Sequence, residues 1–377
     1  MYKNIISFLV CFLVLLNIPS IVQETQSIAI SSPISYFTFF LLSVLIVTNK
    51  TKFPKQILFL AGIASLYYFI GAFQNEVSLK ILLLEYFKFL LYLFGLFISL
   101  RYINHSTIIL LLLAGAITIL LDSLYFRFND FQGIGFVSQY GRYSGFYLNP
   151  NSASVVCSIG YALTIVKINR WKTLAVVFTF MGFLTLSKTF MLVWILITII
   201  YLFLNRKYIV KTIFIVVCAA YALITFSGAL NLETNRLRLL TGMFSGSLDT
   251  GVVNHDGRQD LWSNFYERIA NSPIIGNGYS GFMTTVEGTD LGVHNTFLLI
   301  LGESGFLPFL LFLALFIWLL KRTFTSYINK TDNFLLTLVL ITTLLVSHVF
   351  FSLGIQIFLF SFIIYKITQE EGYIKTI

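Results

Sequence analysis

The sequence predicts an all-α polytopic membrane protein with about twelve transmembrane helices. Hydrophobic residues make up 57% of the 377 positions and charged residues only 11%. A soluble protein of this length would need far more charge to cover its surface. The apolar residues also form continuous runs of about 15 to 25, the length of helical spans, whereas the strands of membrane β-barrels alternate in polarity.

Each predicted span is one continuous apolar run. The spans cover residues 5–21, 34–48, 57–73, 79–100, 107–121, 152–167, 171–187, 189–204, 209–227, 295–320, 334–348 and 352–366. The first run follows Lys3 as a signal peptide would, but no small-x-small cleavage site follows, so we count it as a span. We therefore expect one integral membrane domain over 1–377, with a large periplasmic or extracellular loop at 228–294.

The positive charges predict the orientation in the membrane. With the N-terminus inside, 16 of the 25 Lys and Arg residues fall on segments that face the cytoplasm. An even number of spans then places both termini in the cytoplasm and the two long outer segments, about 122–151 and 228–294, on the other face. The net charge of +9 thus reflects topology and a lipid bilayer partner, and we expect no nucleic-acid partner.

A surface helix is predicted over about 257–270 in the longer outer segment. Asp256 can cap its start, and Pro273 with the Gly276-Asn277-Gly278 turn ends it. Its apolar face recurs at helical spacing and consists of Leu261, Trp262, Phe265 and Ile269. We expect this helix to lie on the membrane surface or over the helix bundle.

Several outer cations run against the positive-inside tendency, so each of them needs a reason. Arg142, Lys188 and Arg258 have Gly, Asn or aromatic neighbours. Arginine can hold a phosphate through two parallel hydrogen bonds, which favours a phosphate or pyrophosphate site. The alternative is a charge that faces water or lipid headgroups, and we prefer it for Arg236, Arg238 and Arg268.

His294 stands where the long outer loop enters the tenth span. A neutral imidazole accepts a proton near neutral pH, so His294 could act as a general base. The alternative is that it is an ordinary polar side chain at the membrane interface. His348, at an outer turn between the last two spans, is the rival candidate. Asn295 follows His294 directly, and Glu303 lies about 13 Å further along an ideal helix, in the membrane and too far to pair with His294.

The Asn149-Pro150-Asn151 triplet opens the sixth span. Proline in a first helical turn is ordinary, so the triplet fits a helix start, and Asn151 can also donate to a glycan or a phosphate. No P-loop, HExxH or Cys-His metal spacing occurs, and the outer face lacks an Asp-x-Asp pair. We therefore expect a function without cofactor, ATP or metal ion. Three cysteines lie in apolar runs and fit core positions: Cys11, Cys157 and Cys218.

Four segments in this order resemble one family of bacterial membrane glycosyltransferases, the O-antigen ligase and polysaccharide polymerase superfamily. They are GRYSGFYLNPNSAS, LSK, GRQDLWSNFYERIANSPIIGNGY and VHNTFLLILGESGFLPF, within about residues 140–320. The resemblance implies a glycan donor on undecaprenyl pyrophosphate, presented at the outer face of the cytoplasmic membrane. In that family, arginines bind the pyrophosphate and a histidine near the tenth span promotes attack by an acceptor hydroxyl.

The resemblance assigns roles to individual residues. His294 matches the catalytic histidine, and Arg258 matches the arginine of the long loop. Arg142 matches the basic residue ahead of the Asn-Pro-Asn piece. Lys188 stands where the family commonly has arginine. This is a departure, because lysine supplies positive charge but cannot form two parallel hydrogen bonds to a phosphate. Asn151, Asn295 and Glu303 are expected to support these groups.

Three functions are open, and we favour the first of them because of the compact length and the composition rich in Ile, Phe, Asn and Lys. The first is a polymerase that joins repeat units of a capsule, exopolysaccharide or O-antigen. The second is a ligase that moves a finished glycan to a lipid or cell-wall acceptor. The third is a flippase for lipid-linked glycan, which would predict polar residues through several spans and repeat symmetry. The expected partners are the lipid-linked donor, an acceptor glycan, a chain-length regulator and a flippase.

Overall fold

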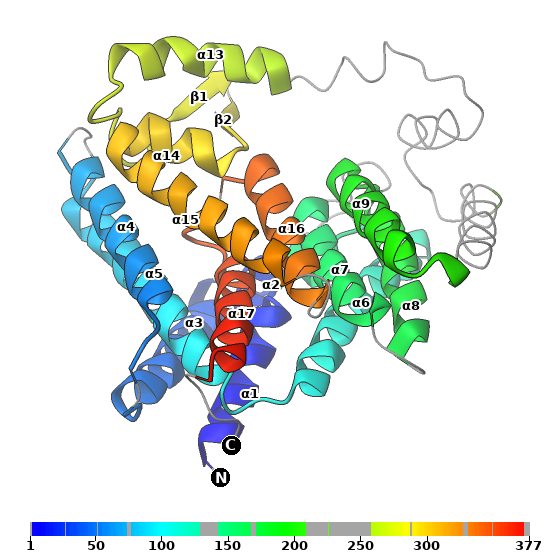
Figure 1. Ribbon diagram of the computed structural model, residues 1–377. Helices are drawn as coiled ribbons and strands as arrows, with labels where there is room; N and C mark the ends of the chain where they lie inside the picture. Colours follow the sequence, from blue (N-terminus) through cyan, green and yellow to red (C-terminus); the bar gives the residue numbers. More distant parts are fainter. Residues whose placement is uncertain are drawn as a thin grey trace. The chain divides into compact units, whose positions relative to one another are not determined.

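The chain divides into two compact units. The first comprises residues 1–10, 36–103 and 257–377, and the second comprises 11–35 and 104–256. The computed structural model describes the ranges 2–26, 28–50, 52–73, 77–128, 142–166, 171–208, 225, 258–286, 289–326, 331–348 and 350–372. Both units are built from helices (Figure 1).

The first unit is a bundle of long apolar helices. Its α4 packs against α5, α14 and α15, and its α17 packs against α5 and α16. The helices of this unit are α1 (Tyr2–Leu15, through Val10), most of α3 (Ile28–Val47), α4 (Lys55–Gly71), α5 (Leu79–Ser99), α13 (Arg258–Asn271), α14 (Thr296–Ser304), α15 (Phe306–Thr325), α16 (Thr331–Val346) and α17 (Gly354–Glu370).

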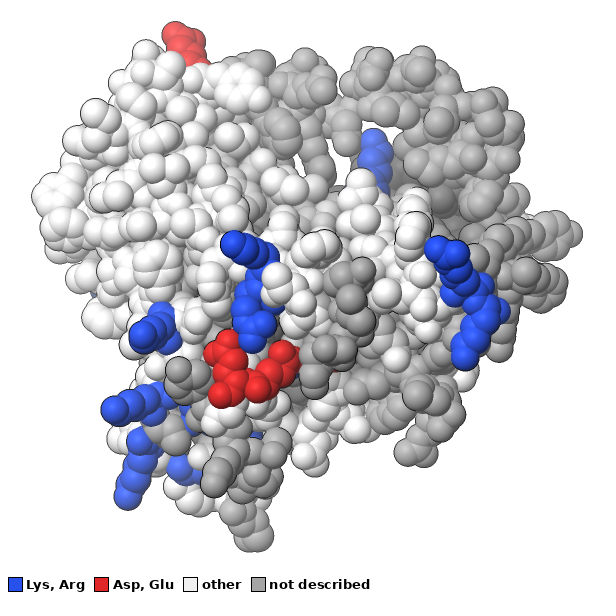
Figure 2. All heavy atoms as spheres, viewed as in Figure 1, with Lys and Arg blue, Asp and Glu red and all other residues white. Residues whose placement is uncertain are grey.

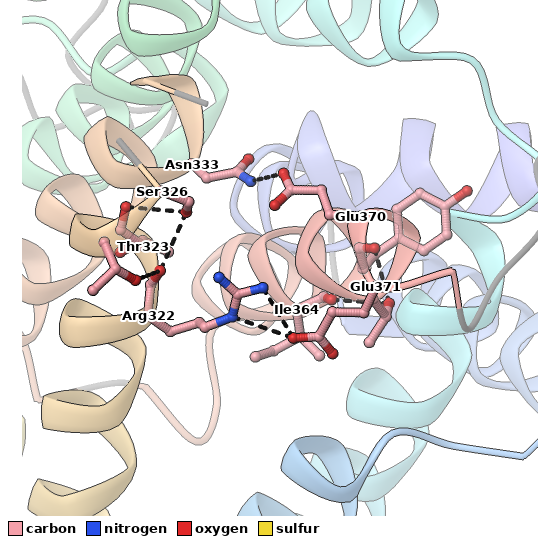
Figure 3. Close-up of polar contacts among 10 residues, drawn as sticks. Arg322, Thr323, Ser326, Asn333, Ile364, Glu370 and Glu371 are labelled. Atoms are coloured by element: carbon pink, nitrogen blue, oxygen red, sulfur yellow. Dashed lines mark hydrogen bonds and ion pairs between the residues drawn. The ribbon is translucent and has the colours of Figure 1, made fainter. Parts of the chain in front are cut away.

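Polar contacts join the helix ends of this bundle near the two termini. Lys3 Nζ donates to the Thr48 carbonyl at 2.9 Å, which ties the start of α1 to the end of α3. Arg322 pairs with Glu371 at 3.0 Å, joining α15 to the end of α17 (Figure 3). Figure 2 shows Lys and Arg of the first unit gathered toward this end. Segments that the sequence predicts to be cytoplasmic thus share one end of the unit.

The second unit is organised around α7 (Pro150–Ile165). This helix packs against α6 (His105–Phe128), α8 (Trp171–Leu184) and α9 (Lys188–Leu204), and most of its residues are buried. A helix that is apolar on all sides is stable where other helices or a membrane cover it, and here the neighbouring helices bury most of α7. The unit also contains α2 (Ile18–Thr25) and the short 3₁₀ turns η1 (Gly145–Tyr147) and η2 (Arg206–Tyr208).

Every predicted span except 209–227 coincides with a helix or a broken pair of helices, and that span lies outside the described residues apart from Thr225. The span at 5–21 is two helices, α1 and α2, bent by 52°. The span at 295–320 is also two helices, α14 and α15, separated at Gly305 with φ 77°. Among the described helices, four are long and apolar enough to cross a membrane, or five with the bent pair. The all-helical membrane fold is thus confirmed in outline, and the count of twelve stays a prediction.

A helix is present where the sequence predicts one, and a short hairpin adds to the predicted fold. Helix α13 runs from Arg258 to Asn271, and the antiparallel strands β1 (Met283–Val286) and β2 (Thr289–Gly292) follow it. Figure 1 shows α13 and the hairpin at the end of the first unit away from the termini. Cys11 and Cys157 are buried and free, as predicted, while Cys218 lies outside the described residues.

The ion pairs at the terminal end of the first unit should differ in their effect on stability. Lys366 and Asp332 meet at 2.6 Å with side chains 17% and 15% exposed, whereas Arg322 and Glu371 are 31% and 32% exposed. We expect Lys366→Met to lower the free energy of unfolding by about 1–3 kcal/mol, since it strands a poorly solvated carboxylate. Arg322→Met should cost about 0.5 kcal/mol. Thermal unfolding in detergent measures both, and equal losses would contradict the assignment.

Candidate active site

His294 lies at the entrance of α14 in a strained backbone conformation. Its φ is 49°, a left-handed value that is uncommon for residues other than glycine. Asn295 then caps the helix, because its Oδ1 accepts from the backbone N–H groups of Phe297 at 3.0 Å and Leu298 at 3.2 Å. Asn295 is therefore a helix cap, and this cap fixes the start of α14 directly after His294.

A second imidazole lies against His294. The ring of His348, from the turn between α16 and α17, meets the His294 ring edge to face, with centroids 4.8 Å apart. Burial, and then the charge of a protonated His294, lower the pKa of His348 to about 4. His348 is therefore neutral near neutral pH. The two histidines treated as rivals in the sequence are neighbours in the structure.

Glu303 anchors the far end of α14 to other parts of the first unit. Its carboxylate accepts a hydrogen bond from the Tyr67 hydroxyl of α4 and from the backbone N–H groups of Ser280 and Phe282. The side chain is buried, with 3% exposure. Glu303 therefore holds the loop that follows α13 against the end of α14.

The turn at residues 276–278 closes the C-terminal end of α14. The Asn277 backbone N–H donates to the Gly302 carbonyl at 2.7 Å, and that of Gly278 to the Glu303 carbonyl at 3.0 Å. These carbonyls lack partners within the helix, because the last turn of a helix leaves its acceptors open. Gly276 has φ 76°, and a Cβ there would lie 2.4 Å from the Glu303 carbonyl carbon. The predicted turn is thus a close backbone contact that requires glycine.

Helix α13 is fastened to the same region by aromatic packing. Phe265 is fully buried, and its ring centroid lies 4.5 Å from that of Phe282. Both belong to a small core with Val293 and Leu299, so α13 rests on the start of α14, and Ile269 packs at its edge. Arg258 begins this helix. The side chains of Arg258, Leu261 and Trp262 lie outside the described residues, as do Arg236 and Arg238.

Arg142 and Asn151 meet in the second unit. The guanidinium of Arg142, which is only 7% exposed, donates to the Asn151 Oδ1 and to the Thr185 carbonyl, each at 3.3 Å. The same Asn151 oxygen accepts from the Ser187 hydroxyl at 3.1 Å. The Asn-Pro-Asn triplet therefore has two functions: Asn149 caps α7, and Asn151 joins Arg142 to the start of α9.

The helices α7 and α9 begin in the same way. Leu148 and Leu186 have φ of 60° and 44°, and each directly precedes the residue that caps its helix. Ser187 caps α9, and Lys188 is the first residue of that helix. Helix N-termini carry positive partial charge, so two linked N-termini with Arg142 and Lys188 form an electropositive group.

The loop that carries Arg142 is held by residues that sequence reasoning missed. Asp122 Oδ2 on α6 accepts from the backbone N–H groups of Ser144 at 3.0 Å and Gly145 at 2.9 Å. The Tyr147 hydroxyl donates to the Leu15 carbonyl at 2.7 Å, at the end of α1. Asp122 begins the outer segment 122–151, and Tyr147 lies within the GRYSGFYLNPNSAS segment, but the sequence predicted no role for either side chain.

The structure thus divides the predicted site residues between the two units. His294, Asn295, Glu303 and the start of α13 belong to the first unit, and Arg142, Asn151 and Lys188 to the second. Each group is ordered by helix caps and buried anchors of its own unit. Within the described residues, no three His, Cys, Asp or Glu side chains come together as metal ligands.

The order of these elements can now be compared with known families. Residues 173–313 match the family model described as O-antigen ligase. The resemblance inferred from the motifs is confirmed over this segment, which contains Lys188, Arg258 and His294, while Arg142 and Asn151 precede it. Comparison with curated proteins and with solved structures gave no match. The family match supports an O-antigen ligase-type transfer at a membrane.

Two glycine variants test the contact between the turn and α14. Gly276→Ala should lower the free energy of unfolding by about 2–4 kcal/mol, since the added Cβ meets backbone atoms and φ is positive. Gly62→Ala, in α4 with nothing within 4 Å of an added Cβ, should raise it by about 0.5–1 kcal/mol. Thermal unfolding of both variants in detergent gives the comparison. A neutral Gly276→Ala would show that the turn does not seat on α14.

Proposed function

We propose that the chain is a polysaccharide polymerase that joins undecaprenyl-pyrophosphate-linked oligosaccharide repeat units on the outer face of a bacterial cytoplasmic membrane, with both termini in the cytoplasm and twelve spans. The observation that carries the proposal is His294 at the capped entrance of α14, inside the segment that matches the O-antigen ligase family. The family match supports glycosyl transfer as the reaction class. The charged end near the termini and the opposite end with α13 support the orientation.

The proposed reaction is one direct displacement without a metal ion. His294 takes the proton from an acceptor hydroxyl, and that oxygen forms a bond to the anomeric carbon of the donor glycan. The bond between this carbon and the pyrophosphate oxygen breaks, and undecaprenyl pyrophosphate leaves with the electron pair. A single displacement inverts the configuration at the anomeric carbon.

The leaving pyrophosphate needs positive charge, which we assign to Arg142, Lys188 and Arg258. In the second unit, the hydrogen bonds of Arg142 to Asn151 and Thr185 hold its guanidinium in a fixed orientation. Lys188 adds a charge at the N-terminus of α9, where the helix dipole also favours anions. Fixed charge placed before the reaction stabilises the departing anion without reorganisation.

A ligase is the alternative, because the matching family is described as O-antigen ligase. Polymerase and ligase share the donor and the displacement and differ in the acceptor. In the polymerase the acceptor is another lipid-linked glycan, and in the ligase it is a lipid or a cell-wall glycan. A chain-length regulator and a flippase are the proposed partners of the polymerase.

Reconstitution with a single substrate pool distinguishes these functions. The purified protein in liposomes receives only lipid-linked oligosaccharides extracted from cells that lack this chain. We expect a ladder of longer lipid-linked glycans, which His294→Ala abolishes and His105→Ala, a histidine at the start of α6, retains. A product that forms only after a core lipid or cell-wall acceptor is added would replace polymerase with ligase. Full activity of folded His294→Ala would exclude His294 as the base.

Two asparagines of one motif provide a matched test of the proposed pyrophosphate group. Asn151→Ala removes the acceptor shared by Arg142 and Ser187, so we expect the KM for the lipid-linked donor to rise about 10-fold or more, near 1.4 kcal/mol of binding. Asn149→Ala removes a helix cap and should cost about 1 kcal/mol of stability with a nearly unchanged KM. Initial rates against donor concentration measure both variants. A KM that rises equally in both would count against a specific role for Asn151.

A further inference from the structure

The turn that carries His348 is tied directly to the first turn of α14. The Thr296 hydroxyl, two residues after His294, donates to the Ser347 carbonyl at 2.6 Å. On the other side, the Gln356 side-chain amide of α17 donates to the Ser347 hydroxyl at 3.0 Å. The residue before His348 is therefore held from two helices. This fixes the backbone from which the imidazole reaches His294.

Space for the His348 ring is provided by a glycine at the end of β2. A Cβ added to Gly292 would lie 2.6 Å from the His348 Nε2 and 2.8 Å from its Cε1, well inside van der Waals contact. Only the absence of a side chain at this position lets the ring lie there. The hairpin, the α14 entrance and the α16–α17 turn thus converge on one imidazole.

We propose that His348 is a positioning residue that holds the imidazole of His294 in its reactive orientation. The inference rests on the proposed function, in which His294 takes the proton from the acceptor hydroxyl. An imidazole on a loop before a helix has several rotamers, and only some of them aim a nitrogen at a substrate. The edge-to-face contact at 4.8 Å restricts that freedom, and a misplacement of about 1 Å can cost about 100-fold in rate.

The electrostatics of the pair agree with this role. Among the described residues, His294 is the titratable group that acts on His348. Because burial, and then the charge of a protonated His294, lower the pKa of His348, His348 keeps its neutral form while His294 holds the proton. Only His294 therefore takes up and releases a proton during a turnover, and the His348 ring stays neutral and in place.

Three variants and one control test the inference in the reconstituted assay with the extracted lipid-linked oligosaccharides. His348→Ala should lower kcat by about 10- to 100-fold and leave the KM for the donor within about 3-fold. Its low-pH limb of kcat/KM should move to higher pH, since water admitted beside His294 favours the imidazolium. His348→Phe keeps an aromatic ring in place and should retain most of kcat. Gly292→Ala should mimic His348→Ala, and His105→Ala should behave as the unaltered chain.

The outcomes separate this inference from the proposed function. If His294→Ala abolishes transfer while folded His348→Ala keeps the kcat and pH profile of the unaltered chain, the positioning role is wrong and the base assignment stands. A His348→Phe variant that is folded but as inactive as His294→Ala would also overturn it. If His348→Ala does not purify as a monodisperse protein, Gly292→Ala decides, because it displaces the ring without removing either imidazole. If His294→Ala itself is fully active, the proposed base fails first.

Discussion

The rest of this structure depends on one constraint: backbone N–H and C=O groups need hydrogen-bond partners wherever an apolar helix is interrupted. In hydrocarbon, an open N–H or C=O group costs several kcal/mol, so a broken span is tolerated only where a neighbour supplies the missing partner. In the second unit, Tyr147 donates to the Leu15 carbonyl where α1 ends. In the first unit, Asn277 and Gly278 donate to carbonyls at the end of α14. At both breaks, the partner comes from a loop that carries or supports candidate site residues.

Three helices begin with the same local arrangement, which also provides backbone N–H groups with partners. A residue with positive φ, then a side chain that caps the helix, introduces α7, α9 and α14. The residues with positive φ are Leu148, Leu186 and His294, none of them glycine. Such strain costs of order 1–3 kcal/mol each and persists where surrounding contacts enforce it. The cap fixes the start of the helix, and the residue with positive φ fixes the direction of the backbone that enters it. The side chains at these junctions therefore have little mobility.

The sequence was informative wherever a local pattern decides the outcome. Apolar runs predicted nearly all helices, and the cap, face and turn of residues 257–278 predicted α13, because these features act between near neighbours in the chain. Broken helices were missed, since a left-handed Asn17 and the break at Gly305 interrupt runs that stay apolar in composition. Contacts between residues far apart in the chain could not be predicted, because no local pattern encodes them. The residues around Tyr67 do not predict its hydrogen bond to Glu303, which lies 236 residues away. The sequence likewise does not predict that the His294 and His348 rings are in contact.

The two buried carboxylates narrow the chemistry that the described residues can perform. Asp122 in the second unit accepts from the N–H groups of Ser144 and Gly145, and Glu303 in the first accepts from those of Ser280 and Phe282. Each acid holds a loop onto a helix through donors of the protein, although the Oδ1 of Asp122 is buried without a hydrogen-bond partner. A carboxylate so engaged is poorly placed to take a proton from a substrate hydroxyl. In the first unit, this reasoning favours an imidazole over Glu303 as the base. Of the two imidazoles there, His294 adjoins the capped helix entrance, while His348 packs against Gly292. This arrangement agrees with the proposal that His294 takes the proton and that His348 positions the His294 ring.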